Sequence, residues 1–538
     1  MISFITNFLG GVGLLLLGMW LLTGGLRSAA GQNLRNTLPG GSGNNRQSLL
    51  TGLLLTAGVQ SSSLISAATL GFVNAQLLSL ERGIWIIYGS NVGTTLSAWI
   101  AALVGVRFNI DGFAFVWIGF GMLLRLWKSK AWAQGLGMAI AGLGCFFLAL
   151  NTLKNGFSTP DINLVSLSFM RDSGFISMLI GFGAGVVFTV LMQSSTAVSI
   201  LLLAAVSNQT VSLPFAAAGV IGANIGTTST IVLASLGATA NARRLAAVHV
   251  LFNVCSGIIA LVLLSPFLWL TAQLASLVNG VTDAALSLAL FNTLFNIFGV
   301  LIMWPMTRPI INWLQGRWQH LQHTDNYQRL EYLDQHSLVI PTVALKSFYL
   351  EIHRLGRDVL NAAHDVLKSA HPQQTKLQQL HQRIELIRHA TNLLNQSPLS
   401  KDVSEKLPIL LRALIHYQML LEHLQTDLPS FNAQSIPAEL NDIYQQINLY
   451  VAEIIRLGQQ EITNQDLAKI TVDWQSLLER YQLLKRKTLQ ITAEGNLSVA
   501  SGDQLLRQLE TLYIIADRTL RAGERLLATS DPINKAKP

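Results

Sequence analysis

The amino-acid sequence predicts an all-α, polytopic membrane protein followed by a soluble helical bundle. Half of its 538 residues are hydrophobic and only 12% are charged. Residues 1–318 hold 14 Lys/Arg and 5 Asp/Glu, whereas residues 319–538 hold 23 and 24. Such an apolar first part is typical of integral membrane proteins. We therefore predict a membrane domain over 1–318, a linker over 319–337 and a soluble helical domain over 338–530.

Apolar runs long enough to cross a hydrocarbon layer of roughly 30 Å recur along the first domain. The first run, near residues 3–25, has neither a basic start nor a small-residue cleavage site, so we expect a retained membrane helix rather than a signal peptide. From residue 320 the pattern changes to amphipathic segments rich in Leu and Gln, which favour soluble helices. The other long runs lie near residues 84–106, 112–127, 133–153, 175–206, 213–236, 245–275 and 285–307.

Several function classes are not supported by the residues present. Cys145 and Cys255 lie inside apolar runs, so we expect packing residues rather than a disulfide. The basic excess lies in short loops between apolar runs, which favours membrane orientation over nucleic-acid binding. The sequence has no Cys/His metal spacing, no Walker-type glycine loop and no nucleophile elbow. We therefore predict no enzyme, no cofactor and no transition-metal site.

Residues 52–95 recur as residues 185–228. A shift of 133 residues aligns the two segments without a gap, and 16 of the 44 positions are identical. The shared residues are mostly Gly, Gln, Ser, Asn and Thr, whereas a chance likeness between membrane helices would be mostly Leu, Ile and Val, so the pattern indicates a duplicated site. Each copy holds two polar motifs, "QSSS" and "GSNVGTT" in the first and "QSST" and "GANIGTTST" in the second. We place repeat one at about 3–127 and repeat two at about 133–307.

The basic residues of the first domain predict its orientation. If the first helix begins outside, eleven of its Lys/Arg residues fall in the cytoplasm and three fall outside. The opposite orientation would invert that ratio, against the positive-inside rule. We therefore expect a multi-pass protein of the plasma (inner) membrane whose C-terminal domain is cytoplasmic.

This orientation gives the apolar run at residues 47–79 an unusual path. Its flanks, Arg46 and Arg82, both fall inside, so the run must enter the membrane and return as a re-entrant hairpin whose tip lies near residue 63, on "QSSS". The equivalent loop of the second copy, residues 207–214, falls outside, so the repeat is inverted. Inverted repeats with broken helices that meet near the midplane are typical of secondary transporters.

The candidate binding residues are the hydroxyl and amide side chains of the duplicated motifs. Hydroxyls can donate to phosphate-type oxygens or coordinate a cation, and free N–H groups at the start of the returning helix favour an anion. For an isolated Ser or Gly in a membrane helix, packing by small residues is a better explanation than ligand binding. Packing does not explain two matched sets of polar residues. The candidates are Gln60, Ser61, Ser62, Ser63, Ser66, Asn91, Thr94, Thr95, Gln193, Ser194, Ser195, Thr196, Ser199, Asn224, Thr227 and Thr228.

Ionisable residues are scarce in the first domain. Its acids are Glu81, Asp111, Asp161, Asp172 and Asp283, and all fall in or near predicted loops or helix ends. Proton-coupled transporters usually place a carboxylate or His within the bilayer, and only His249, in "HVLFN", is available there. His249 is either a packing residue or part of a gate. A neutral, oxygen-rich site suits Na⁺, which would offset the cost of burying an anion beside it.

These features resemble the type II sodium/phosphate cotransporter family in its bacterial form. Besides the two motif pairs, the likeness rests on "GVGLLLLGMWLLTGGL", "HVLFNV" and "NTLFNIFGVLIMWP", and it covers residues 5–310. It implies Na⁺-coupled movement of inorganic phosphate, with residues 60–63 and 193–196 forming the substrate and ion region and the Asn and Thr candidates completing it. Thr196 stands in place of a third serine, which keeps the hydroxyl but adds a methyl group.

The resemblance also implies a PhoU-like helical domain over residues 338–530. A regulatory or oligomerising role for that domain is a hypothesis, and no acidic metal cluster accompanies it. The preferred function is Na⁺-coupled phosphate transport by alternating access, with inorganic phosphate, Na⁺ and the lipid bilayer as partners. A membrane-bound phosphate or anion sensor, or a Na⁺-coupled carrier of another oxyanion, are the alternatives.

Overall fold

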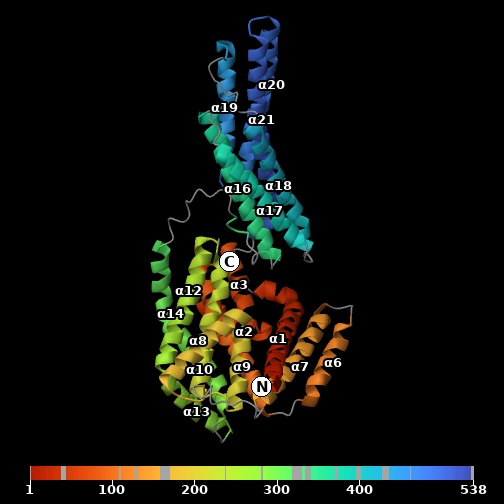
Figure 1. The fold of residues 1–538 in the computed structure, drawn as a ribbon. Coiled ribbons are helices and arrows are strands. Elements are labelled where there is room, and N and C mark those ends of the chain that lie inside the picture. Colours follow the sequence, from red (N-terminus) through yellow and green to blue (C-terminus); the bar gives the residue numbers. More distant parts are fainter. Residues whose placement is uncertain are drawn as a thin grey trace. The chain divides into compact units, whose positions relative to one another are not determined.

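The fold is known from a computed structural model (Figure 1). The residues that the structure describes are 2–37, 44–107, 111–127, 131–157, 170–236, 238–279, 283–317, 330–333, 338, 341–369, 374–395, 401–426, 436–460 and 462–534. Over these residues the ordered elements are α-helices, without a strand. The chain divides into two compact units, Met1–Gln322 and His323–Pro538. Each unit is described by itself.

The N-terminal unit is a helical assembly with apolar side chains both in its core and on its surface. Exposed large side chains include Leu191 at 73% and Val262 at 76%, which is the arrangement expected of helices that face lipid rather than water. Its helices are α1 Ile2–Thr37, α2 Asn45–Val59, α3 Ser62–Asn74, α4 Leu80–Gly93, α5 Thr95–Arg107, α6 Asp111–Arg125, α7 Ala131–Phe157, α8 Phe175–Met192, α9 Ser195–Ser207, α10 Leu213–Gly226, α11 Thr228–Ser235, α12 Ala240–Val262, α13 Leu264–Asn279 and α14 Ala284–Arg317.

Six helical stretches among the described residues are long and apolar enough to cross a membrane. They are Ile5–Ala29, Trp132–Phe157, Phe175–Met192, Leu213–Ser235, Ala240–Val262 and Ala284–Leu314. Several other apolar helices are too short to cross alone, among them α3 and α9. The all-α, polytopic membrane fold predicted from the sequence is therefore confirmed. The inverted orientation of the repeats and the re-entrant path of residues 47–79 stay predictions.

Several apolar runs that read as single segments in the sequence are broken in the structure. The run at 175–206 is split between α8 and α9, and the run at 84–106 is split between α4 and α5. Residues 47–79 form two helices, α2 and α3, which meet at Gln60 and Ser61 rather than at residue 63. Each of these breaks coincides with a polar motif, because Gln, Ser and Thr can satisfy the backbone groups that a broken helix exposes.

The two copies of the repeat have nearly the same backbone at the first break. Gln60 ends α2 in the left-handed region with φ 59° and ψ 30°, and Gln193 ends α8 there with φ 51° and ψ 28°. Such positive φ values are uncommon outside Gly. The likeness between the two copies thus extends from residue identity to backbone dihedral angles.

In each copy, glycines bring the helix before the first break into backbone contact with the helix before the second break, α2 with α4 and α8 with α10. In copy one, a Cβ on Gly89 of α4 would lie 1.8 Å from Leu49 O of α2. In copy two, a Cβ on Gly222 of α10 would lie 2.0 Å from Phe182 O of α8. Only Gly permits so close an approach, so the shared Gly positions hold the two helix pairs in matching arrangements.

The C-terminal unit is a bundle of long amphipathic helices. In Figure 1 the end of α19 lies beside α20 and α21, and these helices pack against one another. Its core is built from Leu, Ile, Val and Ala. Its helices are α16 Pro341–Ser369, α17 Gln374–Asn395, α18 Lys401–Thr426, α19 Ala438–Gly458, α20 Asn464–Ala493 and α21 Val499–Asn534. The predicted linker at 319–337 lies outside the described residues except for 330–333.

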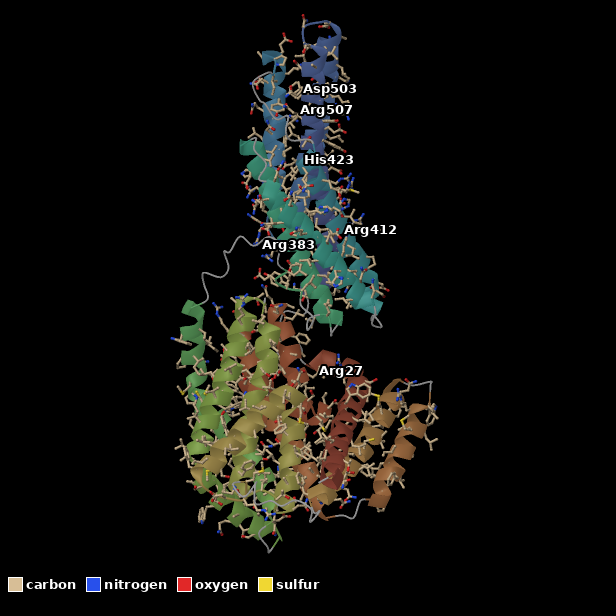
Figure 2. The ribbon with its side chains drawn as sticks, viewed as in Figure 1. Arg27, Arg383, Arg412, His423, Asp503 and Arg507 are labelled. Atoms are coloured by element: carbon tan, nitrogen blue, oxygen red, sulfur yellow. The ribbon has the colours of Figure 1, made fainter. Side chains whose placement is uncertain are left out.

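One charged network is buried inside this bundle. The Arg383 guanidinium of α17, labelled in Figure 2, is fully buried and lies 2.7 Å from Asp358 Oδ2 of α16. Glu351 is also fully buried and accepts the backbone N–H groups of Glu331 and Tyr332, each at 2.8 Å. Burial raises the pKa of the Glu351 carboxyl above its ordinary value, and Arg354 opposes that rise. Glu351 thereby attaches residues 331–332 to α16.

Candidate functional site

The first polar motif of each copy caps a helix that begins at the break. Ser61 Oγ accepts from Leu64 N at 3.3 Å, and Ser194 Oγ accepts from Ala197 N at 3.2 Å. Both serines have extended backbone, as N-cap residues do. The two following residues in each copy occupy the first turn of α3 or α9, where N–H groups have no intrahelical partner. Each tip therefore presents backbone donors and hydroxyls together, which is a favourable setting for an anion.

The second polar motif of each copy breaks a helix in a different way. Thr94 and Thr227 follow α4 and α10, with φ −63° in both copies and ψ −24° and −22°. Their hydroxyls donate to the carbonyl oxygens three residues earlier, at 2.6 and 2.5 Å. Thr95 and Thr228 do the same at 2.8 and 2.7 Å. A hydroxyl whose proton is used in this way meets any further ligand through its lone pairs, so these threonines favour a cation.

The predicted residues differ in how far they are buried. Ser66 and Ser199, one helical turn beyond Ser62 and Ser195, are buried in α3 and α9. The buried candidates are Gln60, Ser66, Asn91, Thr95, Ser195, Ser199, Asn224, Thr227 and Thr228; the partly exposed ones are Ser61, Ser62, Ser63, Thr94, Ser194 and Thr196; Gln193 is exposed.

The two copies contact each other through helices that carry these motifs. Helix α3, which follows the first tip, packs against α11, which follows the second motif of copy two. Conversely, α9 packs against α5. The helix after each tip thus meets the helix after the other copy's Thr-Thr pair. Among the described residues no hydrogen bond joins the two tips directly, so the structure brings the four motifs into one assembly through helix packing.

Two asparagines of α14 join the site, although the sequence did not single them out as site residues. Asn224 Nδ2 donates to Asn296 Oδ1 at 3.0 Å. Asn296 Nδ2 in turn donates to Asn292 O at 2.8 Å and to Asn292 Oδ1 at 3.1 Å. All three side chains are buried. The signal was present in "NTLFN", a motif with two amides one helical turn apart in an apolar segment, where polar groups are costly unless paired.

Three hydroxyls of copy one were also missed, those of Thr56, Ser90 and Ser97. Ser97 Oγ donates to Gln60 Oε1, and Thr56 Oγ1 donates to Ser90 Oγ at 2.7 Å. Ser97 is the third residue after Thr94 and so lies on the same face of the chain after the second break. These bonds tie the first motif of copy one to the segment around its second motif.

His249 is buried in α12, and neither ring nitrogen has a hydrogen-bond partner among the described residues. Its backbone carbonyl accepts from Asn253 Nδ2 at 3.0 Å. The choice between a packing residue and a gate therefore stays open. Within the described part of the chain, no group of three or more His, Cys, Asp or Glu is placed to hold a metal ion.

Comparison with known proteins identifies the chain's relatives. The Na⁺/Pi-cotransporter family matches residues 14–155 and 172–303. The chain belongs to this family. Both copies of both motifs lie inside the matched segments, so the sites described above are part of the Na⁺/Pi-cotransporter region. The match ends at residue 303, and the PhoU-like character expected for residues 338–530 stays a prediction.

Two relatives illustrate the likeness. A protein of Escherichia coli (strain K12) named "Putative inorganic phosphate export protein YjbB" is 27% identical over 392 residues, which cover 72% of this chain and 70% of that protein. "Uncharacterized protein YqeW" of Bacillus subtilis (strain 168) is 30% identical over 297 residues, 54% of this chain and 91% of that protein. No solved structure matches the chain. The protein is thus a multi-pass membrane member of the Na⁺/Pi-cotransporter family.

Proposed function

We propose that this protein carries inorganic phosphate across the plasma (inner) membrane, coupled to Na⁺, by alternating access. The observation that carries the proposal is the duplicated helix break at Gln60–Ser61 and Gln193–Ser194. In both copies a glutamine with left-handed backbone ends one helix, and a serine caps the start of the next. Family membership and the printed name of the Escherichia coli relative support phosphate as the substrate.

Phosphate would be held between the two capped helix starts. The first-turn N–H groups of α3 and α9 and the hydroxyls of Ser62 and Ser195 supply donors, and no carboxylate of either motif opposes the anion. Backbone N–H groups at a helix start carry the positive end of the helix dipole. Such a site binds oxyanions by donors and dipole rather than by a charged side chain, so release breaks no ion pair between phosphate and the protein.

Sodium would bind beside the phosphate, where carbonyl and hydroxyl oxygens gather at the ends of α4 and α10. The lone pairs of Thr94 and Thr227 and the last carbonyl groups of these helices supply oxygens, and helix C-termini favour cations. Co-binding lowers the cost of burying each charge, because the pair is closer to neutral than either ion alone. That dependence is the physical basis of coupling: neither ion occupies the site well without the other.

The proposal includes the re-entrant, inverted arrangement of the two hairpins and a cytoplasmic C-terminal unit. In a secondary transporter the direction of net flux follows the combined Na⁺ and phosphate gradients, so import and export are two uses of one cycle. The name of the Escherichia coli relative refers to export. We therefore propose that the same site serves both directions.

The test is phosphate flux in proteoliposomes that contain the purified full-length protein. Radiolabelled phosphate should exchange across the membrane faster than in protein-free liposomes, and unlabelled phosphate should compete more strongly than sulfate. A variant lacking residues 330–538 should keep this flux, because the whole proposed site lies in the N-terminal unit. The absence of protein-dependent flux in the full-length protein would contradict the proposal, and stronger competition by sulfate would change its substrate.

A further inference from the structure

The two copies of the repeat share a backbone but differ at the side chain of the tip glutamine. In copy one, Gln60 is 7% exposed. Its Nε2 donates to Ala57 O at 2.5 Å, and its Oε1 accepts from Ser97 Oγ of α5. Both ends of the amide are therefore held, one by α2 and the other by the helix that follows the second break.

In copy two the corresponding glutamine is not held in this way. Gln193 is exposed, although its φ and ψ match those of Gln60 within about ten degrees. The shift of 133 residues places Thr230 at the position of Ser97. Thr230 Oγ1 instead donates to Thr227 O of its own helix turn at 2.8 Å. In the part of the chain that the structure describes, no hydrogen bond reaches the Gln193 side chain.

This difference is not explained by local sequence. Serine and threonine at these two positions offer the same hydroxyl, and the glutamines have the same backbone. A Thr hydroxyl that bonds its own turn can be redirected to another acceptor by rotation about one side-chain bond. The two copies therefore carry a hydroxyl at the same position of the repeat, and in this conformation only the hydroxyl of copy one bonds its glutamine.

We infer that Ser97 and Thr230 are matching positioning residues, each of which closes one hairpin tip by bonding its glutamine, and that the two closures alternate. This inference rests on the proposed function. In the conformation described, Ser97 holds Gln60 while Gln193 is free of Thr230. In the opposite conformation Thr230 holds Gln193, and the Ser97–Gln60 bond is broken. Each glutamine thus reaches substrate from the open side and is withdrawn from it on the closed side.

The main test measures the apparent KM for phosphate from each face of the membrane, in proteoliposomes of one orientation. Ser97→Ala removes one closure and should shift the population toward the conformation in which copy one is open. Because apparent affinity scales with the fraction of the competent conformation, the apparent KM should fall on one face and rise on the other, by about threefold or more for one hydrogen bond. Thr230→Ala should move the two values in the opposite directions.

Three further variants separate this role from a general structural one. Ser97→Thr and Thr230→Ser keep the hydroxyl and should restore the wild-type ratio of the two KM values. Ser235→Ala is a matched control, because Ser235 lies on the same helix beyond the motif and its Oγ donates to its own turn, to Val232 O at 2.8 Å, so the ratio should stay unchanged. Equal shifts on both faces, or shifts in the same direction for Ser97→Ala and Thr230→Ala, would overturn the inference.

A second measurement does not depend on flux. In a Cys145→Ser/Cys255→Ser background, cysteine pairs at Gln60 with Ser97 and at Gln193 with Thr230 are treated in membranes with a short bifunctional thiol reagent. Both pairs should cross-link, because both closures form in turn. Cross-linking of the first pair alone would show that copy two does not close and would overturn the inference. If both pairs cross-link but the Cys145→Ser/Cys255→Ser parent, which keeps both glutamines, moves no phosphate, the proposed function is contradicted and the alternating closures still stand.

Discussion

Asn224 of α10 and Asn296 of α14, which are 72 positions apart in sequence, share a buried hydrogen bond in which Asn224 Nδ2 lies 3.0 Å from Asn296 Oδ1. Asn224 belongs to the second motif of copy two, and Asn296 belongs to α14. A buried amide without a partner costs far more than a paired one gains. This bond therefore fixes α14 against the end of α10, beside the oxygens that we propose for Na⁺.

Asn296→Ala leaves the Asn224 amide unpaired. We expect a loss of about 1–3 kcal/mol in stability and a several-fold rise in the Na⁺ concentration needed for half-maximal flux. Thermal unfolding in detergent and Na⁺ titration of phosphate flux measure the two effects. The double variant Asn224→Ala/Asn296→Ala should be less destabilised than the sum of the single variants, and strict additivity would contradict a direct interaction.

Asn253→Ala is the matched control for that variant. Asn253 is as buried as Asn296, but its amide donates to His249 O within its own helix. Its removal leaves no side-chain partner unpaired, so the Na⁺ dependence of flux should stay close to that of the wild type. An equal shift in the Na⁺ dependence would mean that amides in this region act through general packing.

Gly185→Ala should disrupt the packing of α8 against α10. The added Cβ would lie 2.0 Å from Gly219 O, a backbone atom that cannot move aside as a flexible side chain can. Overpacking of this kind typically costs about 1–3 kcal/mol, sometimes more. Gly183→Ala on the same helix meets nothing within 4 Å and serves as the control. The yield and melting temperature of the purified variants distinguish them, and equal losses would show that this close approach is absent.

Gln60→Gly and Gln193→Gly separate backbone from side chain at the two tips. Glycine adopts positive φ without strain, so both breaks should persist and both variants should stay folded in the membrane. The amides are lost, and we expect phosphate flux to fall at least tenfold in each. Flux and melting temperature are measured together. Near-normal flux in both variants would mean that the two amide side chains take no part in transport and that the glutamines serve only the backbone conformation of the breaks.

Local patterns in the sequence predicted much of the N-terminal unit. Hydropathy and charge indicated a polytopic membrane fold, and the repeat located both polar motifs, because these features depend on neighbouring residues. The breaks at Gln193 and Thr94 were not visible as helix ends, since apolar residues continue on both sides. A left-handed glutamine has no sequence signature of the kind that Gly provides.

Partners that come from distant segments could not be predicted in the same way. Ser97 and Asn296 lie in apolar helices, and the hydrogen-bond partners that they meet, Gln60 and Asn224, lie 37 and 72 positions away. Only packing of the folded chain brings those pairs together. The roles of the sixteen candidate residues stay predictions, and the variants at Gln60, Gln193 and Asn224 test three of them.

The buried ion pair of the C-terminal unit supports a prediction about stability alone. Arg383→Ala should lower the stability of that unit by about 3–5 kcal/mol, because Asp358 then loses its partner in a largely buried position. Arg388→Ala removes an exposed pair with Glu385 and should cost about 1 kcal/mol or less. Limited proteolysis and thermal unfolding of the full-length protein measure the difference. Neither variant should change the initial rate of phosphate flux.

Sodium coupling is the central claim, and one measurement tests it most directly. Phosphate uptake is followed in proteoliposomes with an inward Na⁺ gradient, with the same gradient of K⁺, and with the Na⁺ gradient reversed. We predict accumulation of phosphate against its own gradient in the first case, none in the second, and net efflux from preloaded vesicles in the third. Equal phosphate movement with Na⁺ and K⁺ would contradict the account.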